Sequence, residues 1–200
     1  AAGERARLSV ERATRQAELA RLARTAQVVT VGAPAVVVDA LWRAQQRMAA
    51  ERPGCGVRWS LLAAISQVES GHGGGRVDAS GQASPVILGP VLDGTVFSLI
   101  LDTDGGALDA DTVHDRAVGP MQFIPTSWAI YARDGNGDGR RDPSNYYDAA
   151  LAAAEHLCRA GHDHRDPGGV SRAVFGYNRS PAYNAKVLAL ADEYGAVRLR

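Results

Sequence analysis

Glu69 is the side chain of this sequence whose position best suits acid catalysis. It ends an apolar segment in which Leu61, Leu62 and Ile65 recur at helical spacing. An apolar environment and the negative end of a helix dipole both disfavour a charged carboxylate, so together they raise its pKa. A carboxylic acid that stays neutral near pH 7 is able to protonate a leaving oxygen. We therefore predict a general acid here; an ordinary solvated glutamate near a helix end is the alternative.

A second candidate site is a run of oxygen-bearing side chains that alternate with glycines. Its candidate ligands are Asp134, Asn136, Asp138, Arg140 and Asp148. The first three stand at positions one, three and five of a calcium-loop pattern, a glycine follows at position six, and position seven contributes its backbone carbonyl. Asn145 stands at position twelve in place of the usual glutamate, so Asp148 is the natural residue to close a longer loop. The pattern predicts a structural Ca²⁺ site in a loop over 134–148; a plain cluster of Asx-Gly turns is the alternative.

Two further segments carry side chains that suit sugar binding. Gln122 follows a glycine-centred turn, and its amide offers both a hydrogen-bond donor and an acceptor. Tyr177 and Asn178 are expected in a turn before the last helix, where a ring and an amide would line a groove. A tyrosine satisfied within the core is the alternative for Tyr177.

The elements that must position these residues are mainly helices. Apolar spacing predicts helices over 35–50, 58–70, 125–133, 145–159 and 180–194. Between 76 and 114, short apolar runs punctuated by Gly, Asp, Ser and Pro predict a small hairpin or a long ordered insertion. Residues 1–34 are interpreted as an N-terminal helical arm and residues 35–200 as one catalytic domain. The predicted fold class is mainly α, with a small β insertion.

Composition limits the class of function. A chain of 200 residues with 46% hydrophobic content suits one compact domain. The 22 basic and 22 acidic residues cancel, so bulk charge does not call for a nucleic acid partner. No apolar run approaches the roughly 18 residues that a membrane span needs. We expect a soluble, monomeric protein without a nucleic acid partner or an organic cofactor.

Cys55 and Cys158 are the two cysteines of the chain, and each lies at the border of a predicted helix. An even count is typical of an oxidising compartment. A disulfide that closes a loop of roughly 100 residues contributes about 4.7 kcal/mol in the chain-entropy model. We predict this disulfide, with two free buried thiols as the alternative. The sequence opens on Ala1-Ala2-Gly3 without a methionine, so we expect an exported or envelope-associated protein whose signal or anchor has been removed.

Three segments, taken in order along the chain, resemble the signature of lytic murein transglycosylases. They are Glu69-Ser70, Gly119-Pro120-Met121-Gln122 and Tyr177-Asn178. The loop closed by an aspartate at its fifteenth position resembles the B-type branch, that of membrane-bound lytic transglycosylase B. The resemblance covers roughly residues 55–195 and implies a goose-type lysozyme-like fold. Because Lys186 is the only lysine and Ala and Gly are abundant, the composition suggests a GC-rich coding bias. Together with the exported wall enzyme that the resemblance implies, this bias suggests an actinobacterial source.

The resemblance implies a role for each matching residue. Glu69 acts as general acid and then as general base. The sugar-binding residues are Ser70, Met121, Gln122, Tyr177 and Asn178. The substrate is the glycan strand of peptidoglycan, whose β-1,4 bond between N-acetylmuramic acid and N-acetylglucosamine is cleaved without water. The muramyl residue closes a 1,6-anhydro ring.

Two departures from the family pattern concern the sugar contacts. His156 stands where an aromatic residue is common in the helix after the calcium loop, and residues 76–115 have no counterpart. The resemblance therefore leaves substrate contacts in these two regions unassigned.

Three alternative activities stay open. A hydrolytic muramidase needs a second carboxylate roughly 5 to 5.5 Å or 6.5 to 9.5 Å from the acid. Its candidates are Asp78, Asp93, Asp102, Asp104 and Asp115. A non-catalytic glycan-binding module stabilised by calcium predicts that Glu69→Gln leaves function intact. A zinc peptidase would draw on His72, Asp78, His162 and His164.

Overall fold

A computed structural model describes residues 9–10, 12–18, 32–161, 163 and 166–196. Its elements are α2 (Ala35–Glu51), α3 (Trp59–Ser70), β1 (Leu88–Val91), β2 (Arg116–Val118), α4 (Pro125–Tyr131), α5 (Tyr146–Gly161), α6 (Pro167–Tyr177) and α7 (Pro181–Gly195). The predicted fold class, mainly α with a small β insertion, is confirmed. Of the predicted N-terminal arm, residues 9–10 and 12–18 are helical, and most of the remainder lies outside the described residues. The domain boundary at residue 34 stays a prediction.

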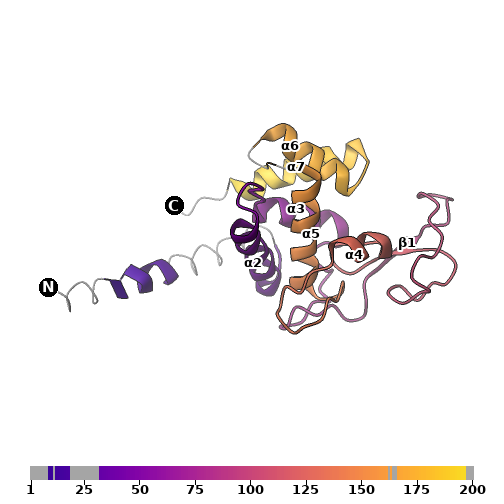
Figure 1. The fold of residues 1–200 in the computed structure, drawn as a ribbon, viewed down its shortest axis with the longest axis horizontal. Coiled ribbons are helices and arrows are strands. Elements are labelled where there is room, and N and C mark those ends of the chain that lie inside the picture. Colours follow the sequence, from indigo (N-terminus) through magenta and orange to yellow (C-terminus); the bar gives the residue numbers. More distant parts are fainter. Residues whose placement is uncertain (1–8, 11, 19–31, 162, 164–165, 197–200) are drawn as a thin grey trace.

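Helix α5 passes through the middle of the helical bundle (Figure 1). Its buried face is rich in alanine, as at Ala149, Ala150, Ala152, Ala153 and Ala154. Such small side chains let neighbouring helices approach closely, and α5 contacts α2, α3, α4 and α6. Helix α3 packs along α7. This packing fixes the end of α3, where Glu69 lies, against the rest of the bundle.

Helix α6 is not among the predicted helices. Asp166 caps its start, because the side-chain carboxylate accepts hydrogen bonds of 3.0 Å from the backbone N–H groups of Gly168 and Gly169. Pro167 occupies the first turn, where a proline is favoured. Tyr177 is therefore the last residue of a helix, with Asn178 as its C-cap. This corrects the expectation that these two residues share a turn.

The predicted disulfide is present. Cys55 and Cys158 are bonded with their Cα atoms 5.3 Å apart. The bond ties the loop before α3 to the C-terminal half of α5, across a sequence separation of 103 residues. Among the helices that the structure describes, none is long and apolar enough to cross a bilayer.

The β insertion differs from a local hairpin. Strands β1 and β2 pair antiparallel, with Leu88 opposite Val118 and Val91 opposite Arg116. Residues 92–115 therefore form an excursion between two paired strands, and it projects away from the helices (Figure 1). The partner of β1 lies just beyond the segment in which a hairpin is predicted. The sheet brings the base of this excursion to the side of the bundle where α3 ends.

Candidate active site

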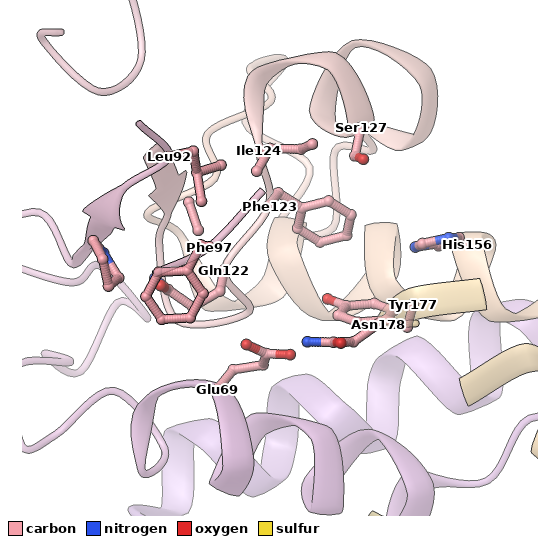
Figure 2. Close-up of a pocket in the computed structure, with 12 residues that line it drawn as sticks. Glu69, Leu92, Phe97, Gln122, Phe123, Ile124, Ser127, His156, Tyr177 and Asn178 are labelled. Carbon is pink, nitrogen blue, oxygen red and sulfur yellow. The ribbon is translucent and has the colours of Figure 1, made fainter. Parts of the chain in front are cut away.

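Glu69 lies in a pocket formed by the end of α3, the β sheet, the segment after β2 and the end of α6 (Figure 2). One side is lined by Phe123, His156, Tyr177 and Asn178. The other side is lined by Pro90, Leu92, Phe97 and Gln122. The structure thus brings together the predicted acid, the predicted amide and the predicted aromatic ring, although they come from segments far apart in the sequence.

The acidity of Glu69 is set by two opposing effects. Burial disfavours the charged carboxylate and raises its pKa to about 7. The hydroxyl of Tyr183 donates a hydrogen bond of 2.5 Å to Oε1, which acts in the opposite direction because it stabilises the charged form. Near neutral pH the side chain is therefore able both to give and to take a proton.

Glu69 is the only carboxylate among the described residues that line this pocket. The aspartates considered for a second acid are Asp78, Asp93, Asp102, Asp104 and Asp115. Each accepts a hydrogen bond from a backbone N–H group elsewhere in the insertion. None of these five aspartates is among the described residues that line the pocket with Glu69.

Gln122 stands at the corner of a tight turn after β2. The turn is closed by reciprocal backbone hydrogen bonds between Val118 and Phe123, at 2.8 and 3.0 Å. A side chain at Gly119 is excluded, because a Cβ there would lie 1.8 Å from the carbonyl oxygen of Pro143. Gln122 itself has a positive φ of 52°, and its Nε2 donates to the carbonyl of Gly119 at 2.8 Å. Its amide therefore reaches the pocket in a fixed orientation.

Ser70 and Met121 support this turn and do not line the pocket. Ser70 Oγ donates to the carbonyl of Pro120 at 2.7 Å and accepts from the N–H of Gly73 at 2.9 Å. The side chain of Met121 is fully buried. Ser70 therefore links the end of α3 to the turn that carries Met121, and a contact of either residue with sugar stays a prediction.

The ring of Tyr177 belongs to an aromatic stack at one end of the pocket. Its hydroxyl donates to the carbonyl of Met121 at 2.8 Å. His156 lies between Tyr177 and Tyr131, with ring centroids 4.9 and 4.2 Å away. Burial, with a smaller contribution from the charge of Arg159, lowers the pKa of His156 to about 4. The imidazole is therefore neutral at physiological pH, and it stacks at the position where the resemblance to lytic transglycosylases implies an aromatic residue.

Tyr183 is a site residue that the sequence does not reveal. It lies in the first turn of α7, where the N–H of Tyr183 donates to the capping Ser180 Oγ at 3.3 Å. Its partner Glu69 is 114 residues away in the sequence, and nothing local to either residue links them. The packing of α3 along α7 creates the contact.

Comparison with known proteins bears on the same region. Residues 115–174 match the family model described as the transglycosylase SLT domain. The match supports a relation to lytic transglycosylases, and the mainly helical fold is consistent with a lysozyme-like SLT domain. No curated protein and no solved structure gives a significant match. The matched segment contains Gln122 and His156 but ends before Tyr177, and Glu69 precedes it, so the roles of the acid and the tyrosine rest on pocket geometry.

The 134–148 loop lies within the matched segment and is closed by Asp148. This carboxylate is fully buried, and its oxygens accept hydrogen bonds from the N–H groups of Gly135 at 2.7 Å and Asp142 at 2.9 Å. Asp134 accepts from the N–H groups of Gly137 and Gly139 at 2.6 and 2.9 Å. Asp148 thus connects the start of the loop to its second half.

The donor chemistry of this loop fits a hard cation, since it combines carboxylate, amide and carbonyl oxygens. Burial raises the pKa of Asp148, so its charge is costly without a positive partner. Among the described residues, however, the group of acidic oxygens that lie within 4.8 Å of one another belongs to Asp102, Asp104 and Asp115. Calcium binding by the 134–148 loop therefore stays a prediction.

The structure gives no support to a zinc peptidase. His72 is buried in the core, where its Nδ1 is 2.8 Å from Ser66 Oγ. His162 and His164 lie outside the described residues.

Proposed function

We propose that this protein is a B-type lytic transglycosylase of peptidoglycan. It would cleave the β-1,4 bond between N-acetylmuramic acid and N-acetylglucosamine without water and leave a 1,6-anhydro end. The observation that carries the proposal is the lone carboxylate of the pocket, Glu69, whose pKa is raised to about 7. The family match over residues 115–174 supports the substrate class.

A single carboxylate suffices for the proposed reaction. Neutral Glu69 transfers its proton to the glycosidic oxygen as the bond to the muramyl C1 breaks. The carbonyl oxygen of the substrate's own N-acetyl group stabilises the developing positive charge at C1. Ionised Glu69 then takes the proton of the muramyl 6-hydroxyl as O6 bonds to C1. The acid is thereby returned to its neutral state, and no water is consumed.

The remaining pocket residues hold the sugar for this sequence of events. The Gln122 amide reaches the pocket from the turn, and the ring of Tyr177 and the amide of Asn178 line its far side (Figure 2). Tyr183 holds the carboxyl group of Glu69 in one orientation through its hydrogen bond. Fixed positions of this kind lower the barrier because less freedom is lost when substrate binds.

Two further features belong to the proposal. A structural calcium ion would be held by Asp134, Asn136, Asp138, the carbonyl of Arg140 and Asp148. The ion would stiffen the loop that precedes α5 and take no part in the chemistry. The protein would work outside the cytoplasm, where its substrate lies, and the Cys55–Cys158 disulfide is typical of that compartment.

Digestion of purified sacculi by wild-type protein and by Glu69→Gln tests the proposal. The substitution removes the proton donor and keeps the shape of the side chain, so we expect release of soluble fragments to fall by about 100- to 10,000-fold. Glu193→Gln on the exposed face of α7 is the matched control and should release fragments at the wild-type rate. Fragment release by Glu69→Gln at the control rate would contradict Glu69 as the acid and favour an acid elsewhere. No fragment release by wild type would favour a binding module.

A further inference from the structure

Residues 92–115, the excursion between β1 and β2, expose several large apolar side chains. Val96, Phe97, Leu99, Leu101 and Val113 are each at least half exposed. Of these five residues, Phe97 alone lines the same pocket as Glu69. A ligand that covered this half-exposed phenyl ring at the edge of the pocket would gain favourable apolar burial.

The position of Phe97 is fixed by a short hairpin. The N–H of Ile100 donates to the carbonyl of Leu92 at 2.8 Å, and Asp93 pairs with Leu99. Asp93 also accepts from the N–H and the hydroxyl of Thr95, at 2.9 and 2.7 Å. The turn that carries Phe97 is therefore held by its own hydrogen bonds.

The base of this hairpin is joined to the strand that leads to Gln122. Asp115 immediately precedes β2; its carbonyl accepts from the N–H of Leu92 at 3.2 Å, and its N–H donates to the carbonyl of Ile100 at 3.1 Å. The Asp115 carboxylate is fully buried and accepts from the N–H and hydroxyl of Thr103, at 2.9 and 2.7 Å. The hairpin is thus placed relative to the catalytic turn by direct backbone contacts.

We propose that Pro90, Leu92 and Phe97 form a saccharide-binding wall for the glycan strand. Figure 2 shows Phe97 to one side of Glu69 and Tyr177 to the other. The wall would pack against the apolar C–H face of the sugar that lies across the scissile bond from the one beside Tyr177. This inference rests on the proposed function, and it assigns a substrate contact to a region in which the family resemblance leaves such contacts unassigned.

The composition of the pocket favours a sugar over a peptide as the occupant of the wall. A pyranose ring has an apolar face of C–H groups and a polar rim of hydroxyls. The pocket offers the same combination, because its lining includes the apolar wall and also the polar groups of Glu69, Gln122 and Asn178. The wall itself contains no charged side chain that would pair with the ionised groups of a peptide stem.

Glycan strands from which an amidase has removed the peptides provide the test. Affinity is measured in the Glu69→Gln background, where the strands stay intact, and KM and kcat are measured with Glu69 present. Phe97→Ala should raise Kd and KM by about three- to tenfold and change kcat less, the loss expected for one aromatic contact. Phe97→Trp should restore most of the affinity. Val96→Ala is the control, because Val96 is 81% exposed and does not line the pocket.

The outcomes separate this inference from the proposed function. Equal Kd values for the Phe97→Ala and Val96→Ala proteins would overturn the wall, whether or not the protein cleaves glycan. A loss confined to strands that still carry peptides would also overturn it, in favour of a peptide contact. If the protein binds stripped strands in a Phe97-dependent manner but does not cleave them, the result would support the saccharide-binding wall and contradict the proposed transglycosylase activity. Absence of any binding to stripped strands would contradict both.

Discussion

The hydroxyl of Tyr183 on α7 donates a hydrogen bond to Oε1 of Glu69 at the end of α3. The packing of these two helices therefore orients the proposed acid and also affects its proton affinity. Burial raises the pKa of Glu69, and the tyrosine opposes that rise because it stabilises the carboxylate. A residue outside the three signature segments thus helps to set the pH at which the acid works.

Removal of that hydrogen bond should shift the pH dependence of catalysis upward. In wild type, kcat/KM should fall as pH rises through about 7, because the free enzyme loses the proton that it must donate. Tyr183→Phe destabilises the charged form, raises the pKa of Glu69 and so moves this descending limb to higher pH. The profile of glycan cleavage between pH 5 and 9 measures the shift, with Tyr194→Phe, also on α7, as control. An unchanged or lower midpoint would show that Tyr183 does not influence the acid.

The burial of Glu69 should also affect stability. Its pKa rises from 4.5 in the unfolded chain to about 7 in the fold, so the folded state binds the extra proton between these values. Stability from this group is complete below pH 4.5 and is lost as pH rises through 7. Relative to Glu69→Gln, wild type should lose up to about 3 kcal/mol of unfolding free energy over this interval. Urea unfolding at several pH values tests this, and a difference that does not vary with pH would contradict it.

Gly89 in β1 should be needed for the orientation of Gln122. A Cβ at this position would lie 2.7 Å from Oε1 of Gln122 and 3.1 Å from Cβ of Ala117. Gly89→Ala should displace the amide and lower kcat/KM by about ten- to hundredfold, while the unfolding midpoint changes little. Gly54→Ala is a matched control, since no heavy atom lies within 4 Å of a Cβ there. If both variants cleave glycan equally well, the amide of Gln122 is not positioned by β1.

A calcium ion in the 134–148 loop should stabilise the fold. At a concentration about one hundred times its Kd, a bound ion adds about 2.7 kcal/mol to the unfolding free energy. A chelator should therefore lower the thermal midpoint of wild type. Asp148→Asn should abolish that response, whereas Asp192→Asn on α7 should retain it. A wild-type midpoint that is the same with calcium and with chelator would refute the metal site.

The sequence predicts those parts of the fold that depend on local pattern. Helical spacing predicts α2, α3 and α5 to within a few residues, because each buries a continuous apolar or alanine-rich face. Helix α6 is not predicted because a polar, glycine-rich stretch hides its start. Asp166 and Pro167 are its local signal, as an N-cap followed by a first-turn proline.

The residues of the candidate site that belong to a local sequence motif are predictable, whereas a residue that helix packing brings to the site is not. Glu69, Gln122 and Tyr177 share one pocket as expected. Met121 and Ser70 adjoin the same motifs but do not line the pocket. Met121 is buried, and Ser70 donates a hydrogen bond to the turn. The contribution of Tyr183 depends on helix packing across 114 residues, and no pattern within either helix reports such a contact.

In the proposed reaction one carboxylate, Glu69, gives a proton to the glycosidic oxygen and takes one from the muramyl 6-hydroxyl, and no water is consumed. Mass spectrometry of the fragments that wild-type protein releases from purified sacculi tests it most directly. The proposed reaction predicts fragments that end in 1,6-anhydro-N-acetylmuramic acid and that are lost with Glu69→Gln. Fragments with reducing ends, 18 Da heavier because water has been added, would contradict it and identify the protein as a hydrolase.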